Sequence, residues 1–114
     1  MHIYVVIKNI NHIFSGGSMN YTQVIIAYDI ADNKNRSKFY ETLKDFGLLS
    51  IQKSVFWGYL LPSERKSIIS IYKEFCNIEC DKIIMVNAAL EQNINNCFGY
   101  TKEFFRKPDD YDII

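Results

Sequence analysis

The chain has 114 residues, of which 48% are hydrophobic and 15% aromatic, and its 13 Lys and Arg balance its 13 Asp and Glu. This length predicts one domain that buries roughly two-thirds of its unfolded surface, and the composition excludes an intrinsically disordered chain. Zero net charge excludes a uniformly basic protein but is compatible with a local basic patch.

Residues 1–18 differ from the rest of the chain. Their one apolar run is followed by Ser15-Gly16-Gly17-Ser18, typical of a flexible linker, and then by Met19, which suits a native initiator. We therefore expect an N-terminal extension over residues 1–18 and a folded domain over residues 19–114. The alternative is that the apolar run forms an extra edge strand. The segment lacks the basic region and cleavage site of a signal peptide.

Two elements are predicted next. The β-branched and aromatic run over residues 21–29 predicts a buried strand that ends in a polar loop. Residues 33–46 predict a helix, because Phe39 and Leu43 lie one turn apart on an apolar face and Gly47 supplies a stop.

The second half of the domain continues this alternation. Residues 49–61 read as extended chain, long enough for two short strands with a bend at Gly58. Pro62 begins a second amphipathic helix, and residues 82–90 predict another apolar strand. The remainder is polar and mixed, with a short strand expected around residues 98–105 and an acidic end.

The predicted order, β-α-β-β-α-β, indicates the α+β class and a ferredoxin-like fold. Two helices would cover one face of an antiparallel sheet, with an extra C-terminal strand. The other sheet face also needs a cover, since an exposed apolar face would aggregate. We expect dimerisation through this face, with an interface that includes the segment after Leu90.

Asp29 is the most informative residue of the first strand. A carboxylate at the end of an apolar run is costly to bury unless it is paired or bound to a metal, so this position suits a metal ligand or a base. The alternative is that Asp29 caps the following helix. Asp32 lies closer to the helix start and is the better capping candidate.

Other residue types narrow the chemistry further. His2 and His12 are the two histidines, so hydrolysis elsewhere in the chain must rest on carboxylates, thiols, a metal or water. Cys76, Cys80 and Cys97 fit neither a disulfide framework nor a zinc site, and we expect free thiols in a reducing cytoplasm. No apolar run approaches the ~20 residues that a membrane span needs.

Two short motifs connect the chain to a known family. Tyr28-Asp29-Ile30, with Asp32 and Arg36 after it, and Ser54-Val55-Phe56 with Gly58 resemble the CRISPR-associated protein 2 family. Members of this family are small ferredoxin-like proteins of spacer acquisition, often described as endoribonucleases. The resemblance covers about residues 21–90 and leaves residues 1–18 as a departure.

The resemblance implies a homodimer in which the strand-end aspartates of two chains face each other and share a divalent ion. On this sequence, Asp29 would be both the catalytic residue and the metal ligand, and the ion would be Mg2+ or Mn2+. Two carboxylates suit Mg2+, which keeps several of its own waters, and a hydrated ion suits phosphodiester hydrolysis. The implied partners are DNA, RNA or both, and the adaptation integrase, CRISPR-associated protein 1.

Further residues follow from the same resemblance. Arg36 matches a family arginine, and with Lys34 and Lys38 it is expected to bind nucleic-acid phosphates. The alternative for each of the three is a solvated helix face.

Tyr28, Ser54 and Phe56 are expected to support the site. Ser54 would orient a phosphate or a metal water, or merely finish a strand pair. Phe56 fits core or dimer packing better than a platform for stacking a base.

The expected function is a dimeric nucleic-acid-binding component of the spacer-acquisition integrase complex, with metal-dependent endonuclease activity. One alternative is a toxin-type ferredoxin-like endoribonuclease of the virulence-associated protein D type. Another is a non-catalytic interaction module, which would not bind duplex DNA at moderate salt. A neighbouring integrase gene would favour the first function, and a neighbouring antitoxin gene the toxin.

Overall fold

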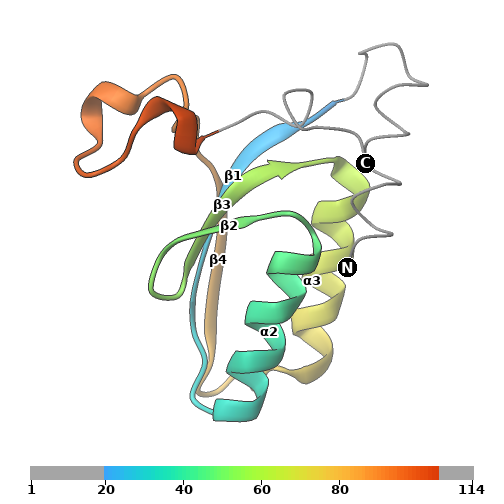
Figure 1. The fold of residues 1–114 in the computed structure, drawn as a ribbon. Helices are drawn as coiled ribbons and strands as arrows, with labels where there is room; N and C mark the ends of the chain where they lie inside the picture. The colour runs from blue at the N-terminus through green and yellow to red at the C-terminus, as the bar shows by residue number, and fades with distance from the viewer. Residues whose placement is uncertain (1–19, 106–114) are drawn as a thin grey trace.

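The structure is a computed structural model and describes residues 20–105. An antiparallel sheet with the strand order β2-β3-β1-β4 carries helices α2 and α3 on one face (Figure 1). The elements are, in chain order, β1 (Thr22–Asp29), α2 (Asn33–Asp45), β2 (Leu49–Gln52), β3 (Val55–Leu60), α3 (Pro62–Phe75), β4 (Lys82–Asn87) and the 3-10 helices η1 (Ile94–Asn96) and η2 (Lys102–Phe104). This arrangement confirms the predicted ferredoxin-like α+β fold. The predicted N-terminal extension and the acidic end lie outside the described residues.

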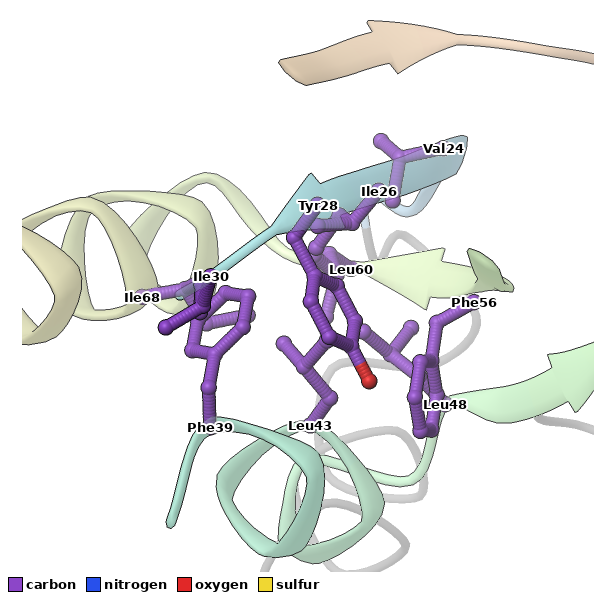
Figure 2. Packing of buried hydrophobic residues seen from close by; sticks show 10 residues of the cluster. All are labelled: Val24, Ile26, Tyr28, Ile30, Phe39, Leu43, Leu48, Phe56, Leu60 and Ile68. Atoms are coloured by element: carbon purple, nitrogen blue, oxygen red, sulfur yellow. The ribbon is translucent and has the colours of Figure 1, made fainter. Parts of the chain in front are cut away.

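The main core lies between the sheet and the two helices. Successive side chains of a strand point to opposite faces, and Val24, Ile26 and Tyr28 of β1 all point towards the helices. There they pack against Phe39 and Leu43 of α2, as Figure 2 shows. The helical spacing that predicted α2 therefore also placed its buried face.

The ends of the helices agree with the caps expected from the sequence. Asp32 is the N-cap of α2, and its carboxylate accepts a hydrogen bond from the backbone N–H of Asn35 at 2.9 Å. This confirms Asp32 as the capping residue and leaves Asp29 available for another role. After α2, Gly47 has a φ of 86°, which suits a residue without a side chain.

The predicted bend at Gly58 is wrong. The β2–β3 hairpin turns at Lys53 and Ser54, and Ser54 takes a φ of 61°. Gly58 lies inside β3, where a Cβ atom would come within 2.5 Å of the side chain of Leu48. This glycine permits close approach of the chain that leads into β2, rather than a change of direction.

The chain after β3 and α3 also differs from the expectation. β4 ends at Asn87 instead of continuing to Leu90, and the strand expected around residues 98–105 is absent from the described residues. Residues 88–105, which we call the C-terminal segment, form turns and the two 3-10 helices. They lie on the sheet face opposite the helices (Figure 1).

The C-terminal segment covers part of that outer face with a second core. Trp57 and Phe105 meet there with ring centroids 4.8 Å apart, both almost fully buried. Several hydrogen bonds fasten the segment to the sheet. Trp57 Nε1 donates to the Ala88 carbonyl at 3.3 Å, the Tyr59 hydroxyl to Glu91 Oε1 at 2.7 Å, and the Tyr100 hydroxyl to the Ile51 carbonyl at 2.7 Å. Gln23 of β1 adds further bonds, accepting from the Ala88 N–H at 3.0 Å and from the Glu91 N–H at 3.2 Å. The C-terminal segment thus covers the part of the outer face that β2, β3 and Ile25 of β1 form.

Within residues 20–105, the part of the outer face along β4 stays uncovered, and we call it the open half. Ile84 is 57% exposed and Val86 48% exposed, and β4 is an edge strand of the sheet. No helix among residues 20–105 is long and apolar enough to cross a membrane. The three cysteines are free thiols, as the sequence predicted.

Candidate functional site

Asp29 is exposed at the end of β1, where the strand leaves the sheet. Strand alternation places it on the outer face, on the same side as Ala27 and opposite to Tyr28. Its register partner on β4 is Lys82. A shallow depression of about 200 Å³ lies at this end of the sheet and is lined by Ala27, Tyr28, Asp29, Lys82 and Ile84.

Tyr28 anchors the strand end from the other face. Its backbone N–H donates to the Ser54 carbonyl at 3.0 Å, and its ring lies 5.1 Å from that of Phe39. Burial, followed by the nearby Tyr40, raises the pKa of Tyr28, while Arg36 and a hydrogen bond with Ser54 lower it. The positive φ of Ser54 therefore belongs to a turn that is tied directly to the end of β1.

A cleft of about 310 Å³ opens beside Tyr28, between α2 and the β2–β3 hairpin. We call it the hairpin cleft. Its walls carry two cationic side chains, five hydroxyl groups and one carboxylate, from Tyr28, Arg36, Ser37, Tyr40, Glu41, Ser50, Lys53 and Ser54. Cations and hydroxyl donors are the groups that proteins use to hold phosphate oxygens.

The predicted basic residues do not form one cluster. Arg36 lines the hairpin cleft, and its guanidinium donates to the Ile30 carbonyl at 2.9 Å and to Asn33 Oδ1. The ammonium of Lys38 lies 5.1 Å from the ring centroid of Phe75 on α3. Lys34 is exposed one turn before Lys38, so the two lysines share a side of α2 that does not include Arg36.

Phe56 is fully buried in the main core, in agreement with the prediction that it serves packing rather than base stacking. Its ring lies 5.2 Å from that of Tyr40, which is 37% exposed at the cleft. The aromatic side chain with a solvent-exposed part at this site is therefore Tyr40, which sequence reasoning missed.

Sequence reasoning also missed Lys53, Ser37 and Ser50, whereas it had named Ser54. Their signal was present: Ser37, Tyr40 and Glu41 fall on one side of α2 by helical spacing, and Lys53 stands in a two-residue polar turn. What the sequence did not reveal was that this side of the helix faces that turn.

One chain alone provides few ligands for a metal ion. Among residues 20–105, no group of three or more His, Cys, Asp or Glu side chains could hold a metal. Asp29 is the one carboxylate among the residues that line the depression at the end of β1, and Mg2+ in proteins is usually held through one or two carboxylates while it keeps several waters.

Comparison with known proteins places the whole site inside one region of similarity. The profile of the family described as CRISPR associated protein Cas2 matches residues 22–94, which include Asp29, Lys82 and the hairpin cleft. The chain is 38% identical over 90 residues to "CRISPR-associated endoribonuclease Cas2 1" of Francisella tularensis subsp. novicida, covering 78% of this chain and 92% of that one.

Two further relatives match shorter parts of the chain. The chain is 41% identical over 58 residues to "CRISPR-associated endoribonuclease Cas2" of Korarchaeum cryptofilum, covering 51% of this chain and 59% of that one. A third, "CRISPR-associated endoribonuclease Cas2" of Desulforudis audaxviator, is 27% identical over 78 residues, covering 60% of this chain and 74% of that one.

Proposed function

Because the chain belongs to the CRISPR associated protein Cas2 family, we propose that it is a homodimeric, nucleic-acid-binding endoribonuclease of CRISPR spacer acquisition. The observation that carries the proposal is the position of Asp29. This carboxylate is exposed at a strand end, at the rim of an apolar sheet face that residues 20–105 leave open. The names of the relatives support the endoribonuclease activity.

A second copy of the chain is the partner that fits the open half of the outer face. Ile84 and Val86 are apolar and exposed there, and burying them against the same residues of another copy removes apolar surface from water. A twofold contact at this end of the sheet brings together the strand-end aspartates of two chains. The C-terminal segment contacts its own sheet in this structure, so the proposed interface centres on β1 and β4.

The paired Asp29 carboxylates would hold one Mg2+ or Mn2+ ion between the two chains. When bound, the ion would offset the charge of both carboxylates and the charge that develops on the phosphodiester. Without the ion, two facing carboxylates repel each other, so each Lys82 would also help to hold the dimer together.

The hairpin cleft supplies the binding part of the proposed function. Arg36 and Lys53 place two positive charges in the cleft against one negative charge from Glu41. This excess suits the phosphate backbone of RNA or DNA, whichever the protein takes. Tyr40 adds a partly exposed aromatic ring at the same site, on which a base can stack.

A second candidate function uses the same dimer as a non-catalytic bridge. Here it would hold DNA between subunits of the adaptation integrase, CRISPR-associated protein 1. The observation in its favour is the small ligand set, since the described part of one chain offers Asp29 but no group of three metal-ligating side chains.

The experiment that separates the two is Asp29→Asn, which removes the charge and keeps the shape. Single-stranded RNA and duplex DNA are incubated with the purified protein and Mg2+ or Mn2+, and light scattering reports the oligomeric state. A nuclease loses cleavage while staying dimeric, whereas a bridge keeps its DNA binding and integrase assembly. Glu74→Gln, an equal charge change at an exposed position of α3, is the control. Cleavage that survives in Asp29→Asn would remove Asp29 from the mechanism.

A further inference from the structure

Asp81 lies in the loop between α3 and β4, immediately before Lys82. Its carboxylate accepts three hydrogen bonds from separate points of the chain. Oδ1 accepts from the Ala31 backbone N–H at 2.9 Å, and Oδ2 accepts from the Asn77 backbone N–H at 2.9 Å. The thiol of Cys80 adds a longer contact to Oδ1 at 3.6 Å.

The bond to Ala31 crosses fifty positions of sequence and ends next to the candidate site. Ala31 follows Asp29 by two residues and precedes the helix cap Asp32. The two backbone N–H groups, Asn77 first and Ala31 second, lower the pKa of Asp81. The side chain therefore stays ionised at neutral pH and holds both donors as a charged acceptor.

Arg36 acts on the same peptide group from the other end. The Ile30 carbonyl, which accepts from the Arg36 guanidinium at 2.9 Å, and the Ala31 N–H, which donates to Asp81, belong to one peptide bond. In a trans peptide these two atoms point in opposite directions. A cation thus holds the partly negative oxygen, and an anion holds the partly positive N–H. Each side chain is opposite in charge to the end of the peptide dipole that it contacts.

This peptide group is the first one beyond Asp29 that lies wholly outside the sheet ladder. The ladder of β1 and β4 ends at the pair of Asp29 and Lys82, so strand hydrogen bonds do not fix the chain after that point. Ile30 is buried, which anchors its side chain, but burial of a side chain does not by itself set the orientation of the peptide group that follows. The two charged side chains supply the orientation that the sheet no longer provides.

We propose that Asp81 is a positioning residue, which together with Arg36 fixes the peptide group after Asp29 and thereby orients the Asp29 carboxylate for cleavage. The inference rests on the proposed catalytic role of Asp29. It assigns Asp81 no contact with the nucleic acid and none with the ion. It also gives Arg36 a second role, beside the phosphate binding predicted from the sequence.

The direct test is the amide of Ala31, because it reports the hydrogen bond independently of any activity. In Asp81→Asn, one acceptor oxygen and the charge are lost, and amide exchange at Ala31 should accelerate by about 10-fold or more in an NMR measurement. Glu79→Gln is the matched control, because it makes an equal charge change in the same loop. Glu79 donates its backbone N–H to Asn77 Oδ1, and this bond does not depend on its side chain. Unchanged exchange at Ala31 in Asp81→Asn would overturn the inference.

The second readout is steady-state cleavage of single-stranded RNA by the full chain. A displaced carboxylate slows the chemical step, so kcat should fall by about 10- to 100-fold with KM within about two-fold of the wild type. Loss of phosphate binding would raise KM instead. An Ala31 amide that loosens without any fall in kcat would also overturn the positioning role.

Two further variants keep the test decisive. If Asp81→Asn fails to fold, Asp81→Glu keeps the charge on a longer stem and should give a smaller fall in kcat. In a double-mutant cycle, Arg36→Gln and Asp81→Asn should lower kcat by less than the product of their separate effects, since both act on one peptide group. If the wild type shows no Asp29-dependent cleavage, the proposed function fails and the catalytic half of this inference with it, while Ala31 exchange still decides whether Asp81 holds the peptide.

Discussion

Asp29 and Lys82 face each other at the last paired position of the β1–β4 ladder, a carboxylate and an ammonium at the rim of the open sheet face. In the proposed dimer, Lys82 competes with the divalent ion for Asp29. Lys82→Ala should therefore tighten the binding of Mn2+ by about five-fold, which corresponds to about 1 kcal/mol for a partly screened pair. Titration calorimetry measures this, with Lys73→Ala on α3 as the control. Weaker binding in Lys82→Ala would mean that the lysine helps to build the ion site.

Two exposed isoleucines test the proposed interface. Ile84 lies on the open half of the outer face, and Ile78 is 94% exposed in the loop after α3. Ile84→Lys should convert the dimer to a monomer at micromolar concentration, because it places two charges in an apolar contact. Ile78→Lys should leave the dimer intact. Light scattering distinguishes the two, and a dimer that tolerates Ile84→Lys would move the interface elsewhere.

Lys53 tests the hairpin cleft. If its ammonium contacts a phosphate, Lys53→Ala should weaken binding of duplex DNA or RNA and reduce the slope of log K against log salt by about one contact per chain. Lys66 lies at an exposed position of α3, outside the cleft, so Lys66→Ala is expected to leave the slope unchanged. Fluorescence anisotropy at several salt concentrations gives both slopes. Equal slopes for Lys53→Ala and the wild type would exclude the cleft from the binding path.

Glu64 predicts a pH-dependent stability. Its carboxyl is buried in the first turn of α3, where Oε1 accepts from the Leu61 N–H at 2.7 Å, and burial raises its pKa to about 7. The native state then holds a proton that the unfolded chain releases above its ordinary pKa of 4.5. The free energy of unfolding should therefore fall as pH rises from about 4.5 to 7, and level off above it.

Glu64→Gln keeps the acceptor and removes the titration. This variant should lose the pH dependence over that range and be more stable than the wild type at pH 8, by about 1–2 kcal/mol once partial screening by solvent is allowed for. Urea denaturation at pH 5 and pH 8 provides the comparison. A wild-type stability that rises between these two pH values would contradict the assignment.

Most of the fold was predictable because its elements carry local signals. The alternation in β1 and the one-turn spacing of Phe39 and Leu43 each follow from a short stretch of sequence, and Asp32 and Pro62 mark helix starts by themselves. The exposed position of Asp29 was predictable for a related reason, since a charge at the end of an apolar strand conflicts with burial, while its role in binding a metal or in cleavage stays a prediction.

The features that escaped prediction depend on contacts between distant residues. The C-terminal segment reaches Trp57 through Ile94, Tyr100 and Phe105, whose spacing follows no helical or strand period. The hairpin turn at Lys53 and Ser54 uses no glycine, so Gly58 was the stronger sequence signal for a turn. A glycine stands at position 58 because Leu48 leaves no room there for a Cβ atom. The hairpin cleft combines one helix with one turn, and neither part predicts the other.

The position of Trp57 gives the molecule a built-in optical probe. It is the only tryptophan in the sequence, and it is packed against Phe105 with its indole nitrogen bonded to the Ala88 carbonyl. Tryptophan fluorescence, excited selectively over that of the eight tyrosines, therefore reports on the outer face. If the C-terminal segment detached, the indole would be exposed to water and its emission would shift to the red. The circular dichroism signal of helices α2 and α3 would stay unchanged. Opening of one layer can thus be followed separately from melting of the other, without attaching any dye.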